Sequence, residues 1–522
     1  QVDLEAARAR YFDLYDMAPV GYCTLSAQGV VLQANLTAAT LLASFAIAAA
    51  PDARELRIGL GSEPSSMDPH YQILHPNEMA ARHVFEPLVF MDERMRLAPG
   101  LATAWRPEGE TDWVFELREG VRWHDGTPFT ADDVVFTIAR APNVPNSPAS
   151  YSLYTRQITA IDVEGPHRLR FRTSGPAPSH PALMAQLSII QRRAAEGATT
   201  ADFNAGRAMV GTGAYRFGSW RPGDRITYTA NLDYWGGTQP WTAVTLRPIV
   251  NPGARVAALM ADDLDLIDAV PPADRLRLAR TPGVQLAETG SNLVMFLNID
   301  HDRDRSPFIF DNQGRPVDRN PLKDLRVRRA ISLAINRNAL VERVMDGSAV
   351  PASQMAPEGF FGFNPELRPD PFDVEQARRL MAEAGWPNGF RLTIHGPNNR
   401  YVNDDKVVQA VAQMLSRIGI QAQVETMPLN VYFTRASRRD FSLFLTGWSA
   451  TTGDPSVPLS IVIHTHDDTL RLGNANRGRY SNAEVDRVIR AALTTVDQAR
   501  REALLREASA LSIADMAIVP LY

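Results

Sequence analysis

From residue 55 onward the chain alternates short apolar runs with amphipathic stretches. Residues 56–61 alternate in polarity, which predicts a strand, and the turn-forming residues of 63–69 end it. Residues 111–125 carry aromatic and aliphatic side chains at alternate positions around a glycine, which predicts a hairpin. Thr130 followed by Asp133 is close to a capping box, so we expect a helix to begin there.

The second half of the chain repeats helices and strands in turn. Three stretches have helical spacing: 325–335, 373–383 and 407–418. Gly385 and Gly419 stand where C-terminal caps are expected. Residues 390–394 and 421–425 have the pattern of strands. Strands that alternate with helices indicate βαβ units, so we expect a largely parallel sheet in this half.

Composition narrows the class of protein. With 45% hydrophobic and 22% charged residues, the chain has the balance of a globular protein. The net charge is -5 and the arginines are scattered among acidic residues, so we expect no nucleic-acid partner. Lys323 and Lys406 are the only lysines among 54 basic residues, a bias we attribute to a GC-rich genome. Cys23 is the only cysteine, which excludes a disulfide framework within the chain.

The first 50 residues differ in kind from the rest. Residues 40–50 form a short apolar run, and Ala46, Ala48 and Ala50 fit the small-residue pattern of a secretory cleavage site; an alanine-rich helix is the other interpretation. Before that run, residues 4–42 resemble the opening of a PAS sensor domain, with a strand-like alternation after a glycine. No apolar run reaches the roughly 18–20 residues of a membrane span.

Catalytic patterns are weak in this sequence. His464, His466, Asp467 and Asp468 form the one dense cluster of histidines and carboxylates, and alternate histidines on a strand are able to face a metal. No distant third ligand is identifiable, so an exposed polar loop is the preferred interpretation. A nucleophile elbow, a P-loop and a zincin motif are all absent from the sequence. We expect no catalytic residue, no metal site and no cofactor.

A colinear set of motifs runs through residues 55–522. They include Glu63-Pro64 with Met67-Asp68-Pro69, Val84–Leu88, Leu97–Trp105, Val121–Val135, Gly211–Phe217, Asn231–Trp235, Arg326–Asn336, Gly447-Trp448 with Gly453-Asp454-Pro455, and Tyr480–Asn482. In this order they resemble the extracytoplasmic solute-binding proteins of family 5, the peptide and nickel type of ABC importer. The resemblance implies an α/β fold: a two-lobed periplasmic binding protein, type II and cluster C-like, with an extra subdomain in the first lobe.

The length of 522 residues also requires more than one core, because single cores stop growing at roughly 250–300 residues. We assign 1–50 to the PAS-like fragment that runs into the signal-like segment, and 51–295 to the first lobe with its inserted subdomain. Residues 296–500 are assigned to the second lobe. Residues 501–522 are expected to return toward the first lobe and to stop short of the family's usual end.

The resemblance also points to ligand-binding residues. Peptide-binding members of the family carry a carboxylate three residues after the Trp of the Gly-Trp motif, and here that position is Thr451. A neutral hydroxyl cannot form the charge-assisted bond that an ammonium favours, so an obligatory free α-amine is not expected in the ligand. Asp454 is a possible substitute or a turn residue. Trp448 is expected to form an aromatic wall, or else to pack in the core.

Two loops complete the predicted site. Asn399, Arg400 and Tyr401 follow a predicted strand, and the planar fork of Arg400 suits a carboxylate or phosphate, although a solvated surface role is the alternative. In the first lobe, three polar residues of the loop after the first strand are candidates, with turn formation as the alternative. They are Glu63, Ser65 and Ser66.

We therefore expect the solute-binding component of a bacterial ABC importer. It is expected to capture a peptide-like or other small solute between two lobes, in the manner of a hinged binding protein, and to deliver it to a membrane permease. Export to the periplasm of a Gram-negative cell and a monomeric state are expected with it. The alternative from another class is a PAS-type sensory protein built on residues 4–42.

Overall fold

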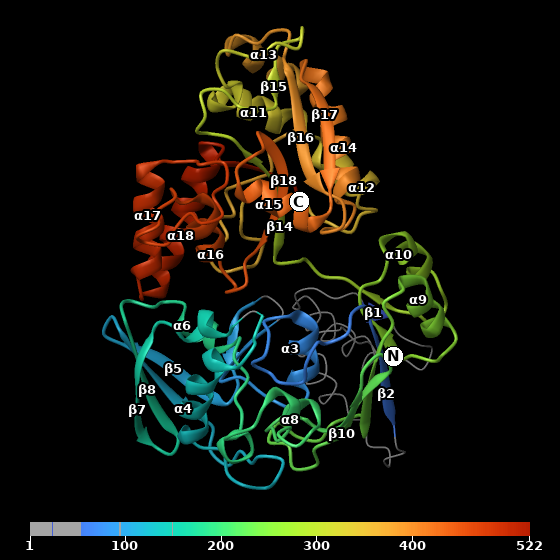
Figure 1. Cartoon of the computed structure of the whole chain (residues 1–522), viewed down its shortest axis with the longest axis vertical. Helices are drawn as coiled ribbons and strands as arrows, with labels where there is room; N and C mark the ends of the chain where they lie inside the picture. The colour runs from blue at the N-terminus through green and yellow to red at the C-terminus, as the bar shows by residue number, and fades with distance from the viewer. Residues whose placement is uncertain (1–22, 25–53, 93–94, 149) are drawn as a thin grey trace, which may run out of the picture. The chain divides into compact units, whose positions relative to one another are not determined.

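A computed structural model describes residues 23–24, 54–92, 95–148 and 150–522 (Figure 1). The chain divides into two compact units, unit 1 up to Thr289 and unit 2 from Gly290 to Tyr522. The division comes a few residues before the boundary expected at 295/296. The PAS-like segment 4–42 and the signal-like segment 40–50 lie outside the described residues, apart from Cys23–Thr24, which form β1. None of the helices in the described part of the chain has the length and hydropathy of a membrane span.

Unit 1 contains a five-stranded mixed sheet with the order β12-β2-β11-β10-β9. The predicted first strand is confirmed as β2 (Glu55–Leu60), which lies between parallel partners, β11 (Ala243–Pro248) and β12 (Leu266–Ile267). The strands β10 (Arg225–Ala230) and β9 (Tyr215–Arg221) continue the sheet in antiparallel pairs. Leu56, Leu60, Val244 and Leu246 are buried in its core.

A second sheet in unit 1 is antiparallel and forms a layer of its own. Its order is β5 (Ala102–Glu108), β6 (Asp112–Leu117), β8 (Arg168–Thr173) and β7 (Ile158–Gly165). Figure 1 shows β5, β7 and β8 side by side, with α4 next to them. This sheet accounts for the extra subdomain expected in the first lobe.

The hairpin predicted over 111–125 is wrong in its second half. The first half is β6, but both edges of β6 are already paired, with β5 and with β8. Residues 121–129 instead close a turn on themselves, since Phe129 N donates to Val121 O at 3.0 Å. The indole of Trp123 is buried and donates to Asp133 Oδ2 at 3.1 Å. Burial against the next helix, and not pairing with β6, therefore explains the aromatic pattern.

The helix predicted to begin at Thr130 is confirmed. α4 (Ala131–Arg140) has Thr130 as its N-cap, and Asp133 Oδ2 accepts the backbone N–H of Thr130 at 3.1 Å. The last residue of α4, Arg140, forms an ion pair with the buried Asp68 at 2.7 Å. Because Asp68 lies in the loop that follows β2, this pair fixes that loop to the helix. The other α-helices in the described part of unit 1 are α3 (His75–Arg82), α5 (Ser152–Thr155), α6 (His180–Met184), α7 (Arg192–Ala195), α8 (Thr200–Asn204), α9 (Pro252–Met260) and α10 (Pro272–Ala279).

Unit 2 is organised around a mixed six-stranded sheet. Five of its strands follow the order β15-β16-β18-β14-β19, and the sixth, β17, also pairs with β16. The predicted strands are confirmed as β16 (Arg391–Pro397) and β17 (Gln421–Met427), which are parallel to one another. β18 (Leu443–Ser449) is also parallel to β16. β14 (Leu293–Ile299) is antiparallel to β18, and β15 (Ile309–Phe310) to β16. The sheet is therefore mixed, with three parallel strands together.

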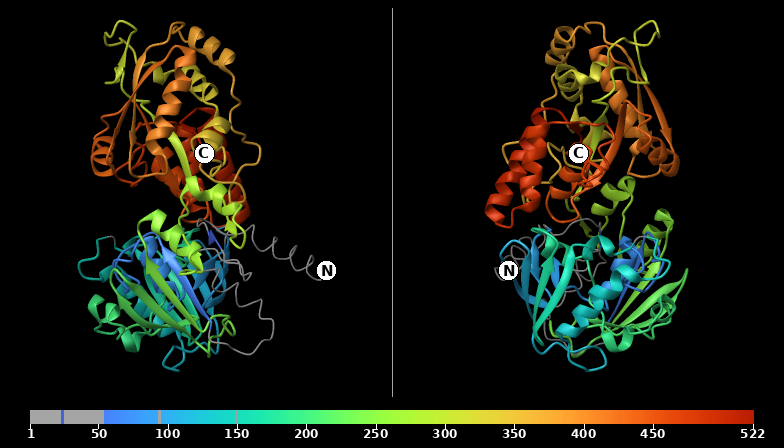
Figure 2. Two further views of the ribbon diagram at one scale, coloured as in Figure 1. Left: turned by 90° about the vertical axis from the view of Figure 1, so that its right-hand side faces the viewer. Right: turned by 60° about the vertical axis from the view of Figure 1, so that its left-hand side comes forward.

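Helices cover this sheet at the predicted places. The three predicted helices are confirmed as α11 (Leu325–Ala334), α13 (Val374–Glu383) and α14 (Asp404–Leu415), and Figure 2 shows helices packed along the strands of this unit. Gly385 and Gly419 have φ values of 85° and 83°, the left-handed conformation of a C-terminal cap. The remaining helices of unit 2 are α12 (Arg337–Arg343), α15 (Leu429–Ser437), α16 (Ser456–Pro458), α17 (Ala483–Thr494) and α18 (Gln498–Ala514).

The end of the chain, residues 501–522, belongs to unit 2, and its expected return toward the first lobe stays a prediction. α18 lies beside α17 (Figure 1), and the chain then forms β19 (Ile518–Pro520), antiparallel to β14. β19 occupies the edge of β14 opposite β18, and Met295 N donates to Tyr522 O at 2.6 Å.

Glu86 is the centre of a buried polar cluster in unit 1. Its side chain accepts three hydrogen bonds of 2.8 Å, from Tyr234 Oη, Thr212 Oγ1 and Trp235 Nε1. Burial raises the pKa of Glu86 to about 7, although these donors and the charge of Arg118 act to lower it. The folded protein therefore holds a proton here that the unfolded chain releases at lower pH.

This pKa predicts a specific pH dependence. As pH rises from about 4.5 to about 7, the unfolded chain loses the Glu86 proton before the folded one, so this group's stabilisation declines across that interval. Glu86→Gln cannot titrate and removes the effect. The free energy of unfolding of the native protein, minus that of the variant, is expected to fall by up to about 3 kcal/mol over the interval. Chemical denaturation over the pH series measures it, and a constant difference would contradict the assignment.

Candidate functional site

The candidate site in unit 2 lies at one edge of its sheet, where parallel strands end together. β16 ends at Pro397, β17 at Met427 and β18 at Ser449, and the first two residues are register partners. In open α/β sheets ligands bind beyond the carboxyl ends of such strands. The loops that follow these strands, 398–403, the start of α15 and 450–455, form what we call the carboxyl edge.

Tyr401 connects two loops of the carboxyl edge. Its hydroxyl accepts the backbone N–H of Gly447 at 3.1 Å, and it lies 3.4 Å from the carbonyl of the same residue. A Cβ at position 447 would come within 2.5 Å of Met295 Sδ and 3.4 Å of the Tyr401 ring. A side chain at position 447 would therefore require the Met295 side chain to move. The hydrogen bond between Tyr401 and Gly447 holds the loop after β16 against the residue preceding Trp448.

Asn399 has a local structural partner. Its side-chain oxygen accepts the backbone N–H of Leu429 at 2.8 Å, so it caps the first turn of α15. The backbone N–H of Asn398 in turn donates to Met427 O at 3.1 Å. These two bonds hold the loop after β16 against the end of β17, and ligand contact by Asn399 stays a prediction.

Arg400 presents its side chain to solvent. Its backbone N–H donates to Asp404 Oδ2 at 2.9 Å, and its guanidinium lies 4.9 Å from the centre of the Tyr401 ring. Within the described part of the chain no ion pair of its guanidinium is present. The side chain is stacked and still has its donors available, an arrangement that suits binding an anion.

Trp448 and Thr451 lie where β18 meets its following turn. Trp448 is half-buried, opposite Val294 on β14, and packs against the core cluster that contains Phe296 and Leu459. Its ring therefore belongs partly to the core and partly to the surface. Thr451 is exposed in the turn after the strand. Both positions are compatible with ligand contact, which stays a prediction.

Asp454 has a partner that sequence reasoning missed. Its Oδ2 lies 2.8 Å from Arg501 Nη2 of α18, and both side chains are almost completely buried. Its Oδ1 accepts the backbone N–H of Ser456 at 2.8 Å. These contacts explain the residue without a ligand, and ligand contact by Asp454 stays a prediction. The sequence held no signal for the pair, because 47 residues separate its members.

The predicted residues of unit 1 also have local partners. Glu63 accepts the backbone N–H of Gly223 at 2.6 Å. Ser66 is buried and donates to Asn204 Oδ1 at 2.9 Å. Ser65 is exposed, and its hydroxyl donates to Gln72 Oε1 at 3.0 Å. Ser65 is therefore the residue of this set most open to solvent, and ligand contact by all three stays a prediction.

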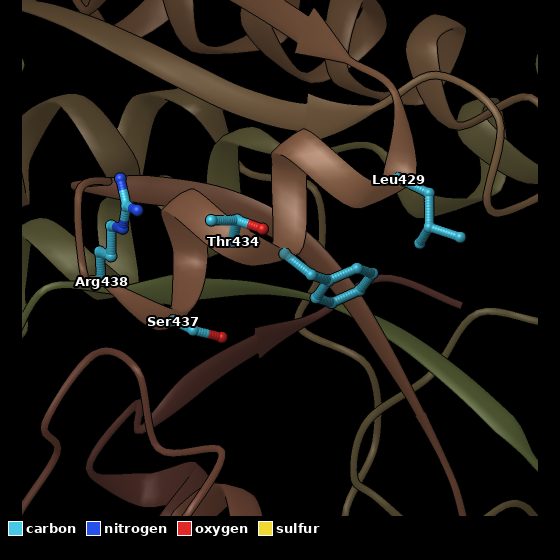
Figure 3. Close-up of a pocket in the computed structure, with 5 residues that line it drawn as sticks. Leu429, Thr434, Ser437 and Arg438 are labelled. Atoms are coloured by element: carbon cyan, nitrogen blue, oxygen red, sulfur yellow. The ribbon is translucent and has the colours of Figure 1, made fainter. Parts of the chain in front are cut away.

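An open cavity of about 670 Å³ lies along α15, beside the carboxyl edge. Figure 3 shows Thr434 and Ser437 along the helix, between Leu429 at one end and Arg438 at the other. Phe433 completes the lining. Leu429 belongs to both features, since its backbone N–H is the group that Asn399 caps. Sequence reasoning missed this cavity, because the lining residues have no motif and only their helical spacing relates them.

The histidine cluster has internal neighbours. His464 is buried, with Nε2 3.2 Å from Arg490 Nη1 and Nδ1 2.6 Å from Thr465 O. His466 Nε2 lies 3.3 Å from Asp468 Oδ1. Across residues 54–522, as far as the structure describes them, no group of three or more His, Cys, Asp and Glu side chains is placed to hold a metal ion.

Comparison with known proteins assigns the chain to a class. Residues 96–469 match the family model described as bacterial extracellular solute-binding proteins, family 5 Middle. The glutathione-binding protein GsiB of Escherichia coli O1:K1 / APEC is 27% identical over 498 residues, which cover 93% of this chain and 91% of that protein.

Solved structures show the same fold. The periplasmic murein tripeptide binding protein MppA, in its unliganded open form, has a TM-score of 0.76 at 24% identity, covering 90% of this chain and 92% of that one. HbpA2 from Haemophilus parasuis has a TM-score of 0.77 at 21% identity, covering 89% of this chain and 93% of its own.

Because Asp454 is paired with Arg501 in the core, we expect replacement of Asp454 to lower the free energy of unfolding far more than replacement of Thr451. Asp454→Ala leaves the buried Arg501 without this carboxylate, so we expect the free energy of unfolding to fall by about 3–5 kcal/mol. Thr451→Ala changes an exposed side chain in the same turn and is expected to stay within about 0.5 kcal/mol. Urea denaturation of the two variants and the native protein measures the contrast. Equal stability of all three proteins would show that the ion pair is not structural.

Proposed function

Because this chain belongs to the bacterial extracellular solute-binding proteins of family 5, we propose that it captures a peptide-like solute at the carboxyl edge of unit 2. We propose that it delivers this solute to the permease of an ABC importer. The observation that carries the proposal is the convergence of the loops after β16, β17 and β18, with Arg400 in the first loop and Trp448 near the end of β18. Family membership confirms the predicted resemblance and the predicted class: the chain is the substrate-binding component of an ABC importer and not an enzyme. The α/β periplasmic binding protein fold with its extra subdomain is confirmed as well.

The chemistry of the edge supports a peptide-like ligand. Arg400 offers a guanidinium that is free to take a carboxylate, and Trp448 offers aromatic surface of the kind that buries area at a low entropic cost. Thr451 is neutral and exposed, so this position does not select for an α-ammonium. Two of the proteins named above, GsiB and MppA, are described as binding glutathione and a murein tripeptide, both of which are peptides.

The cellular setting follows from the same class. We propose export to the periplasm of a Gram-negative cell, as the family's extracellular description and the periplasmic relative support. The contribution of unit 1, through Glu63, Ser65 and Ser66, is part of the proposal. A PAS-type sensory function rests on residues 4–42 and has no counterpart in the family match over 96–469.

The proposed site is tested by ligand affinity. Native mass spectrometry of freshly purified protein identifies any solute that co-purifies, and calorimetry then measures the affinity for it, or for glutathione if none is found. Trp448→Ala and Arg400→Ala are each expected to weaken binding at least about tenfold, since each removes a main contact. Both are expected to leave the thermal unfolding profile unchanged in shape.

Arg343→Ala is the matched control for this test. Arg343 is an exposed arginine at the end of α12 in the same unit, and its replacement removes the same charge. Its affinity for the solute is expected to equal that of the native protein. Native affinity in both Trp448→Ala and Arg400→Ala would sink the proposed site.

A further inference from the structure

Arg477 lies beside the cavity along α15 with its charge uncompensated. Its guanidinium is 5.4 Å from the centre of the Phe433 ring, and Phe433 lines that cavity. The side chain is half-buried, and over the described residues no hydrogen bond or ion pair of its guanidinium is present. Burial lowers the pKa of Arg477, and the groups that favour its charged form are Tyr432 and Tyr401, not a carboxylate.

The other buried arginines of unit 2 have partners. Arg337 donates to the carbonyls of Pro520 and Ser332, and Arg501 pairs with Asp454. Arg479, close to Arg477 in the same loop, has its charged form opposed by Arg439 and favoured by Asp302 and Asp468, whereas among the described residues no carboxylate acts on Arg477. Removing a cation partly from water without a counter-charge costs free energy. An anionic ligand beside Arg477 would offset that cost.

The loop that carries Arg477 is rigid. Asn476 is buried, and its side chain donates to Tyr480 O at 2.7 Å and accepts the backbone N–H of Tyr480 at 3.0 Å. Gly478 lies so close to β14 that a Cβ would come within 1.9 Å of Ile299 O. Because both neighbours of Arg477 are fixed, its backbone is held in place before any ligand arrives, and its guanidinium lies over the Phe433 ring. A fixed backbone reduces the entropic cost of binding.

We propose that the cavity along α15 binds the carboxylate of an organic solute, with Arg477 as its charge partner. The planar fork of the guanidinium suits a carboxylate. Phe433 and Leu429 offer apolar surface to the carbon chain, and the hydroxyl of Ser437 offers a hydrogen bond on the same helix. For its biological ligand the inference rests on the proposed function. Arg400 and Trp448 do not line the cavity, although Tyr401 lies near both Arg400 and Arg477.

A generic dicarboxylate tests the inference independently of the transported solute. Calorimetric titration with succinate is expected to show binding to the native full-length protein, while succinamide, which has the same shape and no charge, is expected not to bind. Arg477→Gln should weaken succinate binding at least about tenfold. Arg477→Lys keeps the charge but loses the fork, so its succinate affinity should lie between that of Arg477→Gln and that of the native protein. Arg343→Gln removes an exposed charge from the same unit and should bind as the native protein does.

Three results would overturn the inference. They are the absence of succinate binding to the native protein, equal succinate affinity in Arg477→Gln and the native protein, and equally tight binding of inorganic phosphate, which would make the site a general anion site. Succinate binding that depends on Arg477 supports the inference even if glutathione and peptides do not bind. A failure of the proposed function is therefore distinguishable from a failure of this site.

Discussion

The parallel pairing of β16 with β17 on one side and β18 on the other is the constraint on which the candidate site depends. Parallel strands end at the same edge of a sheet, so three loops far apart in sequence become neighbours. The register places Pro397 opposite Met427, and the hydroxyl of Tyr401 binds the backbone of Gly447. A side chain at position 447 would come within 2.5 Å of Met295 Sδ, so Met295 would have to move. The position of Arg400 relative to Trp448 follows from these contacts.

Arginines hold much of the surrounding framework through backbone carbonyls. Arg255 in unit 1 donates to the carbonyls of Asp268, Ile249 and Ala269, and Arg337 in unit 2 donates to Pro520 and Ser332. A guanidinium has five donors in a fixed fork and satisfies several carbonyls at once, which an ammonium does less well. Genome composition was the explanation from sequence for the excess of arginine over lysine, and these contacts add a structural one.

The sequence predicted elements whose signal is local. The capping box of Thr130, the glycines at 385 and 419, and the alternation of β2, β16 and β17 depend on residues within a few positions of one another. The colinear motifs gave the fold class and the family. The second strand of the predicted hairpin failed because the burial of Trp123 against α4 has the same alternating pattern as a strand.

Features formed by distant residues were not predictable in this way. The pairing of β19 with β14 joins segments that are roughly two hundred residues apart in the sequence. Hydrophobic periodicity is a local signal and carries no information over such a range. The same holds for Asp454 with Arg501, and for Arg477 over Phe433. The candidate residues Arg400, Tyr401 and Trp448 were found from motifs, but their contacts became visible only in the fold.

Hydrogen exchange with and without a bound solute tests the central claim most directly, because it reports where on the chain the solute acts. With the solute that co-purifies, or with glutathione, we expect slower exchange in the loops of the carboxyl edge, 398–403 and 450–455, and at the start of α15. The exposed end of α12 in the same unit is expected to exchange at the same rate in both states. Saturating solute that leaves all three segments of the carboxyl edge unchanged would contradict the account.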